Sequence, residues 1–347
     1  MNELATLLAD VEPVDDRFAL LAAERHNGLA KPQGSLGRLE ALGARLAAVA
    51  RACPPPAVED PALVIAAGDH GVHAQGVSPW PQEITTMMVE NFCAGRASAN
   101  AIAAACGARV AVLDAGVAKP PADHPALSAA GIRGGTRDLS VEPAMTEAEC
   151  TAALLAGAEL AGRMIDTGAD LIILGDMGIA NTTPSAALIA AFTGEPADRV
   201  TGRGTGIDDR TLEVKIAVVA AALARHGADR DPLRTLASLG GLEHAALAGV
   251  ALAAAARRTP VLVDGVNTVA AALAAAALRP EATGYLIAGH RSVEPGASAG
   301  LAHLGLEPLL DLELRLGEGT GALLAVPLVR SAAAVLRSVA GLDELGT

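Results

Sequence analysis

Aromatic side chains are nearly absent from this sequence, which holds three Phe, one Trp and one Tyr among 347 residues. Proteins that bind single-stranded nucleic acid stack the bases on aromatic rings, so this composition excludes that mode of binding. Positive charge is scarce too, because 26 Lys and Arg stand against 39 Asp and Glu and give a net charge of −13. A negative protein repels a phosphate polymer, and we therefore expect small-molecule ligands and no nucleic-acid partner.

Paired cysteines and long apolar runs are missing as well. The four cysteines show no C-x-x-C spacing, and the acidic start MNELATLLADVEPVDD lacks the apolar centre of a secretory signal. The most apolar window, Ala245 to Ala256, is shorter than the roughly 20 residues that span a bilayer. We expect a cytoplasmic protein with reduced thiols and no membrane segment.

The chain nevertheless carries enough apolar side chains for a large core. They make up 51% of the residues and, with so few aromatics, must be mainly Ala, Val and Leu. Short apolar runs without polar alternation, which are typical of strands buried on both faces, alternate with long Ala-rich helical stretches. The runs lie at 62–67, 108–116, 169–178, 259–265 and 283–289. This order predicts an α/β fold with a doubly wound, mainly parallel sheet.

The two ends of the chain predict a second, smaller part. Residues 1–50 are rich in Leu and Ala at helical spacing, and the Pro-rich stretch CPPPAVEDP separates them from the first predicted strand. A last apolar helix is expected over about 319–338. We predict a small helical lobe built from 1–55 and 319–347, packed beside a large α/β nucleotide-binding domain over 56–318.

Glycine and aspartate gather where the predicted strands end. In doubly wound sheets ligands bind at the carboxyl ends of the strands, where Gly lets a ligand approach the backbone closely. Asp176 and Asp264 could there hold ribose hydroxyls or face a developing cation. The ordinary alternative is that such residues only form turns. The segments concerned are GDHG (68–71), DAG (114–116), GDMG (175–178), DGVN (264–267) and GHRS (289–292).

The stretch GDMGIANTTPSAAL, over 175–188, combines a strand end with a helix start. Asn181, Thr182 and Thr183 precede Pro184, which is favourable in the first turn of a helix. Free backbone amides and hydroxyl groups at such a helix start form an anion site. The alternative is that a Thr serves as a plain helix cap.

A second Gly-rich loop, GRGTGIDDRTLEVK (202–215), leads into another predicted helix. It does not match the P-loop of nucleoside-triphosphate enzymes, and it lacks the strand and the GxGxxG spacing of a dinucleotide fingerprint. Gly204 and Lys215 are the candidates in this loop for holding and neutralising a phosphate. A solvated surface lysine is the alternative for Lys215.

Glu318 lies between two glycines in RLGEGTGALLAVPLV (315–329), directly before an apolar stretch. Partial burial against that helix would raise the pKa of the carboxyl group and make it a better base. The ordinary alternative is that Glu318 only favours the helix dipole. His70 and His73 lie in a turn without an obvious third ligand nearby, so we predict no metal site.

Together these stretches resemble the nicotinate-nucleotide–dimethylbenzimidazole phosphoribosyltransferase family, the CobT family of cobalamin nucleotide-loop assembly. The resemblance extends in order over nearly the whole chain and does not depend on one short motif. The matching stretches are KPQGSLGRLE (31–40), GDHGV (68–72), PQEITTMMVENF (81–92), GDMGIANTTPSAAL (175–188), LVDGVNT (262–268), LIAGHRSVEPGA (286–297), LAHLGLEPLL (301–310) and RLGEGTGA (315–322).

The resemblance implies roles for individual residues. Glu318 matches the family's catalytic glutamate, the base for the benzimidazole N–H. Asp176 stands at the family's second acidic position, where Glu is common. The implied phosphate contacts are Gly178, Lys215 and Ser292, and the implied base pocket includes Pro81, Met87 and Met88.

The resemblance also implies a reaction. The 5-phosphoribosyl group of nicotinate mononucleotide moves to 5,6-dimethylbenzimidazole, giving α-ribazole 5′-phosphate and nicotinate. The pyridinium ring leaves as a neutral base and no pyrophosphate departs, so no cofactor or metal is implied, while a homodimer is. The alternatives are a related phosphoribosyltransferase with another acceptor base, a non-catalytic nucleotide-binding protein, and a dinucleotide-dependent oxidoreductase.

Overall fold

One sheet of six parallel strands runs through the centre of the computed structural model, which describes residues 3–346. The strand order is β3-β2-β1-β4-β5-β6, and every neighbouring pair is parallel. The predicted doubly wound, parallel α/β fold is confirmed. The strands are β1 (Pro61–Gly68), β2 (Arg109–Gly116), β3 (Leu127–Ala129), β4 (Leu171–Met177), β5 (Val261–Val263) and β6 (Leu286–Ala288).

The sequence predicts five of these strands and misses β3. This edge strand pairs with β2 alone and is only three residues long, LSA, with none of them fully buried. An edge strand of this kind needs no apolar run, so the pattern that reveals the five others is absent from it.

Helices connect the strands and cover both faces of the sheet. The α-helices are α1 (Glu3–Asp10), α2 (Asp16–Gly28), α3 (Arg38–Ala50), α4 (Glu83–Cys93), α5 (Ser98–Cys106), α6 (Glu147–Asp166), α7 (Thr182–Thr193), α8 (Ala197–Val200), α9 (Asp209–His226), α10 (Pro232–Leu239), α11 (Leu242–Ala256), α12 (Val266–Leu278), α13 (Pro295–His303) and α14 (Thr320–Ser338). Three short 3-10 helices are η1 (Gly71–Gln75), η2 (Pro280–Tyr285) and η3 (Leu342–Gly346).

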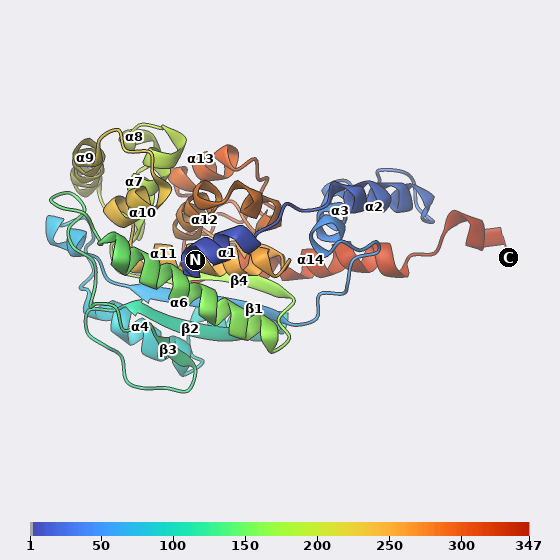
Figure 1. Cartoon of the computed structure of the whole chain (residues 1–347), viewed down its shortest axis with the longest axis horizontal. Coiled ribbons are helices and arrows are strands. Elements are labelled where there is room, and N and C mark those ends of the chain that lie inside the picture. Colours follow the sequence, from blue (N-terminus) through green and yellow to red (C-terminus); the bar gives the residue numbers. More distant parts are fainter. Residues whose placement is uncertain (1–2, 347) are drawn as a thin grey trace.

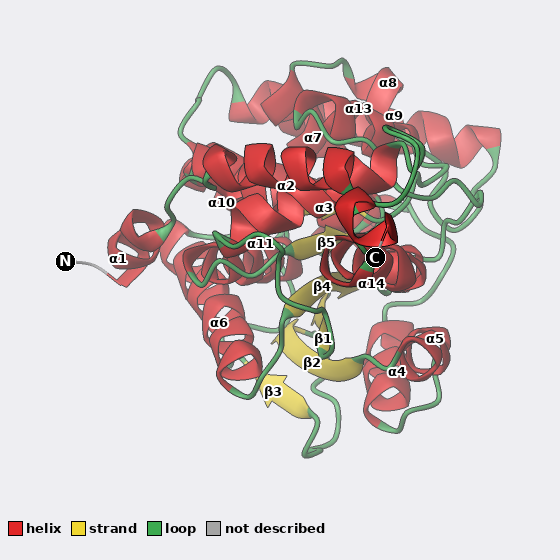
Figure 2. Cartoon of the chain, turned by 90° about the vertical axis from the view of Figure 1, so that its right-hand side faces the viewer, coloured by secondary structure: helices red, strands yellow, loops and turns green. Residues whose placement is uncertain are grey.

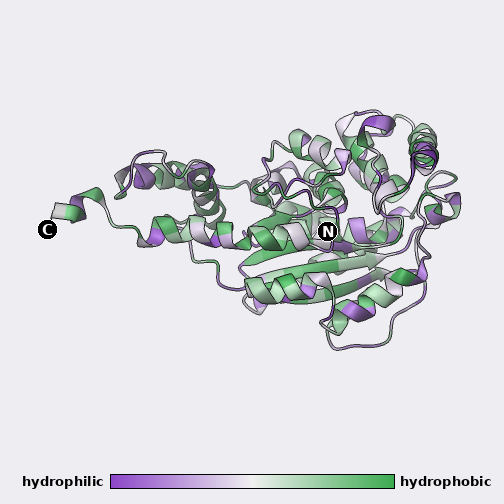
Figure 3. Ribbon diagram, turned by 180° about the vertical axis from the view of Figure 1, so that it is seen from behind, coloured by the Kyte–Doolittle hydropathy of each residue, from purple (hydrophilic) through white to green (hydrophobic). Residues whose placement is uncertain are grey.

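Side chains alternate along the strands, so each strand contributes to two cores. Ala62, Val64 and Ala66 of β1 pack with α6, α7, α11 and α12, whereas Leu63 and Ile65 face α4, α5 and α14. Figure 2 shows the strands between these two layers. Figure 3 shows the strands as a hydrophobic centre, with hydrophilic residues on the outer helices. Burial on both faces explains why the strands read as continuous apolar runs.

Small residues let α6 and α11 pack closely on one another. A Cβ atom added at Gly157 would stand 1.9 Å from the carbonyl oxygen of Ala246, and one at Gly249 would stand 1.8 Å from that of Leu154. Neither distance is possible for a real side chain, so both glycines are required by the contact. Close helix approach replaces the volume that large aromatic side chains fill in other cores.

The helices from the two ends of the chain meet at one side of the molecule. Figure 1 shows α2 and α3 lying on α14, with the C-terminus beyond them. Ala22, Ala47 and Leu336 form a small separate core there. The first helix, α1, packs instead on α6 and α11 of the larger part. The division of the chain at 55/56 and 318/319 stays a prediction.

Among the described residues, α14 is the one helix long and apolar enough to cross a membrane. Leu323, Val326 and Val329 of this helix are buried against the sheet and its neighbours. The predicted helix over about 319–338 is confirmed, and its apolar character is that of a core helix.

Candidate active site

The order of the strands places a crevice between β1 and β4. The chain continues from this pair toward β2 and β3 on one side and toward β5 and β6 on the other. Such a switch point, at the carboxyl ends of the strands, is where doubly wound sheets bind ligands. A cavity of about 600 Å³ lies there, lined by residues that follow β1, β4, β5 and β6 and by the loop before α14.

Glu318 enters this cavity from an unusual loop. Gly317, Glu318 and Gly319 all have positive φ, of 82°, 60° and 81°. A non-glycine residue in this region is strained, and such strain persists only where surrounding contacts enforce it. Asp264 enforces it here, because its carboxylate accepts hydrogen bonds from the backbone N–H groups of Gly319 at 3.2 Å and Ala322 at 2.8 Å.

The carboxyl group of Glu318 is buried, with 6% of the residue exposed. Its Oε2 accepts one long hydrogen bond, 3.4 Å, from the backbone N–H of Ala99 at the start of α5. Burial raises the pKa of Glu318, the Ala99 hydrogen bond opposes the rise, and the charge of Asp264 adds to it. A carboxylate with a raised pKa is a stronger base once ionised.

A second carboxyl group, that of Asp176 at the end of β4, lines the same cavity. Its Oδ2 accepts hydrogen bonds from the side-chain amides of Asn181 at 2.9 Å and Asn267 at 2.5 Å, while Oδ1 has no hydrogen-bond partner. Burial, and after it the charge of Asp264, raise the pKa of Asp176 to about 7. Gly317 leaves room beside Oδ1, because an added Cβ would stand only 3.3 Å away.

Lys215 lies behind one wall of the cavity. It is 2% exposed, and its Nζ donates to Thr182 Oγ1 at 2.6 Å and to the carbonyl oxygen of Gly202 at 3.0 Å. Burial lowers its pKa to about 8, against the raising effect of Glu294. Gly204 has a positive φ of 54°, and a Cβ there would stand 2.9 Å from Thr182 Oγ1. The alternative of a solvated surface lysine is wrong.

The structure brings together most of the predicted site residues. Those that line the cavity are Met88, Asp176, Gly178, Asn181, Thr182, Gly204, Ser292 and Glu318.

The other predicted site residues lie outside that lining. Lys215 reaches it only through Thr182, and Asp264 uses its carboxylate to hold the start of α14. Thr183 is fully buried, whereas Met87 is 61% exposed and Pro81 is also exposed. The substrate roles of all the predicted site residues stay predictions.

Several residues of the cavity wall were not singled out from the sequence. Asn267 and His290 belong to strand-end segments that the sequence does highlight, DGVN and GHRS. Ile84, Glu294 and Arg315 lie in stretches that carry the family resemblance, but those stretches assign no role to them: Ile84 is in the first turn of α4, Glu294 precedes α13 and Arg315 is in the loop before α14. Their place in the wall depends on how the loops fold over the strand ends.

The two histidines near the end of β1 point to different partners. His70 is fully buried, and its Nε2 lies 3.0 Å from Glu243 Oε1. His73 instead donates from Nε2 to the carbonyl oxygen of Trp80 at 2.8 Å. Within residues 3–346, no group of three His, Cys, Asp or Glu side chains is arranged to hold a metal ion.

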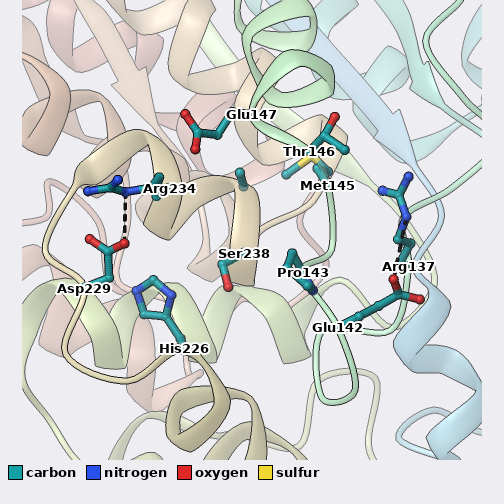
Figure 4. Close-up of a pocket in the computed structure, with 11 residues that line it drawn as sticks. Arg137, Glu142, Pro143, Met145, Thr146, Glu147, His226, Asp229, Arg234 and Ser238 are labelled. Carbon is teal, nitrogen blue, oxygen red and sulfur yellow. Dashed lines mark ion pairs between the residues drawn. The ribbon is translucent and has the colours of Figure 1, made fainter.

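A second cavity, of about 430 Å³, lies where the loop before α6 meets α9 and α10 (Figure 4). Its positive charges are already paired. Arg137 contacts Glu149 at 2.7 Å and Glu142 at 3.9 Å, and Arg234 lies 2.9 Å from Asp229. With its arginines neutralised in this way, this cavity is a weaker anion site than the one at the strand ends.

Comparisons with known proteins agree with the geometry. A family model described as phosphoribosyltransferase matches residues 11–346. A nicotinate-nucleotide–dimethylbenzimidazole phosphoribosyltransferase of Salinispora tropica is 55% identical over 97% of both chains. One of Chloroflexus aurantiacus is 49% identical over 100% of this chain and 99% of its own. The crystal structure of CobT from Thermus thermophilus superposes with a TM-score of 0.93 at 46% identity, covering 95% of this chain and 99% of that one. The chain therefore belongs to the nicotinate-nucleotide–dimethylbenzimidazole phosphoribosyltransferase family.

Proposed function

We propose that this enzyme transfers the 5-phosphoribosyl group of nicotinate mononucleotide to 5,6-dimethylbenzimidazole, giving α-ribazole 5′-phosphate and nicotinate. The relatives named for this activity match the chain over nearly its full length. The observation that carries the assignment of residues is the pair of buried carboxyl groups, Glu318 and Asp176, in one cavity at the strand switch point. The reaction needs one base and one group facing positive charge, and this pair supplies both.

Glu318 is the proposed base. The free ring nitrogen of dimethylbenzimidazole attacks C1′ of the ribose, and the bond from C1′ to the nicotinate nitrogen breaks with its electron pair staying on that nitrogen. The leaving ring thereby becomes neutral without a general acid. The new bond leaves a positive charge on the acceptor ring, and Glu318 removes its N–H proton. Attack opposite the leaving ring converts the β-anomer to the α-product.

Asp176 is the proposed partner of the positive charge that develops on the ribose. Asp176 lines the cavity, and its buried Oδ1 has no protein hydrogen-bond partner, which leaves this oxygen to interact with a ligand. A fixed carboxylate in a cavity from which water is excluded stabilises such a charge more strongly than the same group in water. The two asparagines on Oδ2 hold the group in place.

The 5′-phosphate is proposed to bind on the side of Lys215. Thr182 and Ser292 bring hydroxyl groups to that part of the wall, and Gly178 and Gly204 contribute backbone without side chains. Lys215 supplies positive charge through its contact with Thr182. A dianionic phosphate would stabilise the protonated lysine, which burial alone disfavours. Anion binding at the start of α7 fits the position of free N–H groups at a helix N-terminus.

The flat acceptor base is proposed to bind on the apolar side of the cavity. Trp80, Ile84, Met88 and Leu316 contribute to that wall. Met88 is flexible and polarisable, which suits a wall that contacts flat heterocycles. Met87, in contrast, points away from the cavity lining and is mostly exposed.

We further propose that the Ala-rich helices of about 15–50 and the C-terminal helix form an apolar surface that pairs two copies of the chain as a homodimer. Leu20 and Leu21 on α2 are 67% and 48% exposed, and such neighbouring apolar side chains are typical of an interface. A cytoplasmic location is proposed on the ground that the four cysteines are free thiols.

The function is tested by following nicotinate release from nicotinate mononucleotide with and without dimethylbenzimidazole. The proposal requires release that depends on the acceptor and yields one α-ribazole 5′-phosphate per nicotinate. Release at the same rate without the acceptor would indicate a hydrolase and overturn it. A set of alternative acceptor bases at equal concentration then identifies the preferred one.

A further inference from the structure

A chain of buried polar side chains leads from Asp176 into the protein, away from the cavity. Asn267 Nδ2 donates to Asp176 Oδ2 at 2.5 Å, and Asn267 Oδ1 lies 2.5 Å from Ser185 Oγ. Ser185 Oγ lies 2.7 Å from His244 Nε2, and His244 Nδ1 lies 2.7 Å from Glu243 Oε1. Ser185, His244 and Glu243 have no exposed surface. Four elements, β4, α12, α7 and α11, thus contribute to one continuous chain.

The number of hydrogen atoms available fixes the direction of each bond. Burial would raise the pKa of Glu243, but the charges of His244 and His70 outweigh it and lower the pKa, so Glu243 is a carboxylate that only accepts. The nitrogen of His244 that faces Glu243 must therefore carry a hydrogen. Ser185 Oγ carries a single hydrogen but has three neighbours that could take it. They are Asn267 Oδ1 at 2.5 Å, His244 Nε2 at 2.7 Å and the carbonyl oxygen of Asn181 at 2.9 Å.

An ionised Asp176 decides where that hydrogen goes. A carboxylate requires the amide side of Asn267 toward it, which turns the carbonyl oxygen of Asn267 to Ser185. Two oxygen atoms 2.5 Å apart need a hydrogen between them, so Ser185 donates to Asn267. Ser185 then has nothing to give His244, and His244 must donate from Nε2. His244 consequently carries hydrogens on both ring nitrogens and is an imidazolium.

A neutral His244 produces the opposite arrangement. Its bare Nε2 takes the hydrogen of Ser185, and Asn267 must then turn its amide to Ser185 and its carbonyl oxygen to Asp176. At 2.5 Å that carbonyl oxygen can face Asp176 only if the carboxyl group is protonated. The charge on Asp176 and the charge on His244 are therefore tied together through two neutral side chains.

We propose that Ser185, Asn267 and the His244–Glu243 pair are positioning residues that hold Asp176 as a carboxylate, with Oδ1 directed to the reacting ribose. This inference rests on the proposed function, in which Asp176 faces positive charge. Burial raises the pKa of Asp176 to about 7 even though Asn267 and Asn181 donate hydrogen bonds to it, so the carboxyl group is about half protonated near neutral pH. A small change in the hydrogen bonds that Asp176 receives therefore changes the fraction of this group that is ionised.

The surrounding charges agree with an imidazolium at this place. Glu243 lies against His244 and also against His70, whose ring is 6.1 Å from that of His244. Asp69 adds negative charge beside His70. Near Asp176, in contrast, Asp264 and Glu243 are both negative and oppose its ionisation. The network therefore supports the carboxylate of Asp176 through hydrogen bonds, against the negative charge of its own end member Glu243.

The direct test observes the hydrogens of His244 in the intact enzyme without substrate. Nitrogen NMR of the enzyme with labelled histidine, with the His244 signals assigned by their loss in His244→Gln, distinguishes a bare ring nitrogen from a protonated one. We expect both ring nitrogens of His244 to carry a hydrogen at pH 8, because the hydrogen count requires this when Asp176 is ionised. A bare Nε2 at pH 8 would overturn the inference.

A variant pair tests the connection. Ser185→Ala removes the link, while Thr193→Ala removes a hydroxyl group from the same helix that bonds two backbone groups, the carbonyl oxygen of Ile189 and the N–H of Glu195. In Ser185→Ala, Nε2 of His244 should be bare at pH 8, and kcat should fall with KM for nicotinate mononucleotide nearly unchanged. Because Asp176 then ionises only at higher pH, the loss of kcat should shrink as the pH rises. Thr193→Ala should change neither property.

The outcomes separate this inference from the proposed function. A loss of kcat that is equal at every pH, with an unchanged His244 spectrum, indicates a merely structural role and overturns the inference. A changed His244 spectrum with wild-type kcat leaves the network standing and removes the proposed role of Asp176. If Ser185→Ala does not fold, the spectrum of the wild-type enzyme decides alone.

Discussion

Glu318→Gln is the substitution that tests the mechanism most directly. Gln keeps the size of the side chain and can still accept a hydrogen bond from Ala99, but it cannot take up the proton of the acceptor base. Removing a general base lowers kcat by roughly 10²–10⁴, which corresponds to about 3–5 kcal/mol of transition-state stabilisation. KM for nicotinate mononucleotide should change little, because the phosphate is held on the side of Lys215. Nicotinate release under saturating conditions measures the effect.

The pH dependence gives an independent check on the same residue. Burial raises the pKa of Glu318 above the ordinary glutamate value of 4.5. Because the base acts when ionised, the wild-type rate should fall on the acid side at a pH above 4.5. In Glu318→Gln this limb should become shallower, because the rate then depends on one ionised carboxyl group, Asp176 with its pKa of about 7, and no longer on two. An unchanged limb would assign it to another group.

Stability separates catalysis from a structural role. A carboxyl group whose pKa is raised on folding stabilises the protein below its unfolded pKa, and this contribution is lost as the pH rises through the folded pKa. At pH 8 wild type therefore carries the cost of a buried charge that Gln lacks. The melting temperature of Glu318→Gln at pH 8 should equal or exceed that of wild type, and the difference should shrink toward pH 4.

The opposing explanation is that Glu318 only favours the start of α14. It predicts a loss of about 0.3–1 kcal/mol of stability with turnover nearly intact. Glu313→Gln is a matched control, because Glu313 also has a positive φ, of 55°, and lies at the same cavity but is exposed. Its turnover should remain within a few-fold of wild type. A stable Glu318→Gln enzyme with near wild-type kcat would refute the assignment of the base.

Three further predictions concern the phosphate, the acceptor base and the assembly. Lys215→Ala should raise KM for nicotinate mononucleotide by the equivalent of about 1.5–3 kcal/mol and that for the acceptor far less, as measured by varying each substrate; equal effects would contradict a phosphate role. Met88→Ala should raise KM for the acceptor, whereas Met87→Ala should leave it unchanged. Unsubstituted benzimidazole should also be accepted, and its rejection in a competition assay would disprove this. Sedimentation at micromolar concentration should give a dimer, and a species of 34.6 kDa would be the contrary result.

The sequence by itself determined the fold class and the edge of the sheet that holds the site. Apolar runs without alternation are a local property, and burial on both faces leaves no polar position in them. Gly, in most cases together with Asp, follows each run and marks the strand end. This signal is also local, because turns that face a ligand need small or polar residues. Glu318 stands out between two glycines, and in the structure all three adopt positive φ.

Only the tertiary structure decided which polar side chains face one another. The hydrogen bond from Lys215 to Thr182 joins residues 33 positions apart, the contact of Ser185 with His244 spans 59, and that of Asn267 with Asp176 spans 91. In the sequence, His244 and Glu243 open an Ala-rich helix without any pattern of a site. Partners at such separations meet because the sheet sets the register and the helices close over it. The charge of a buried group then depends on those partners and not on its neighbours along the chain.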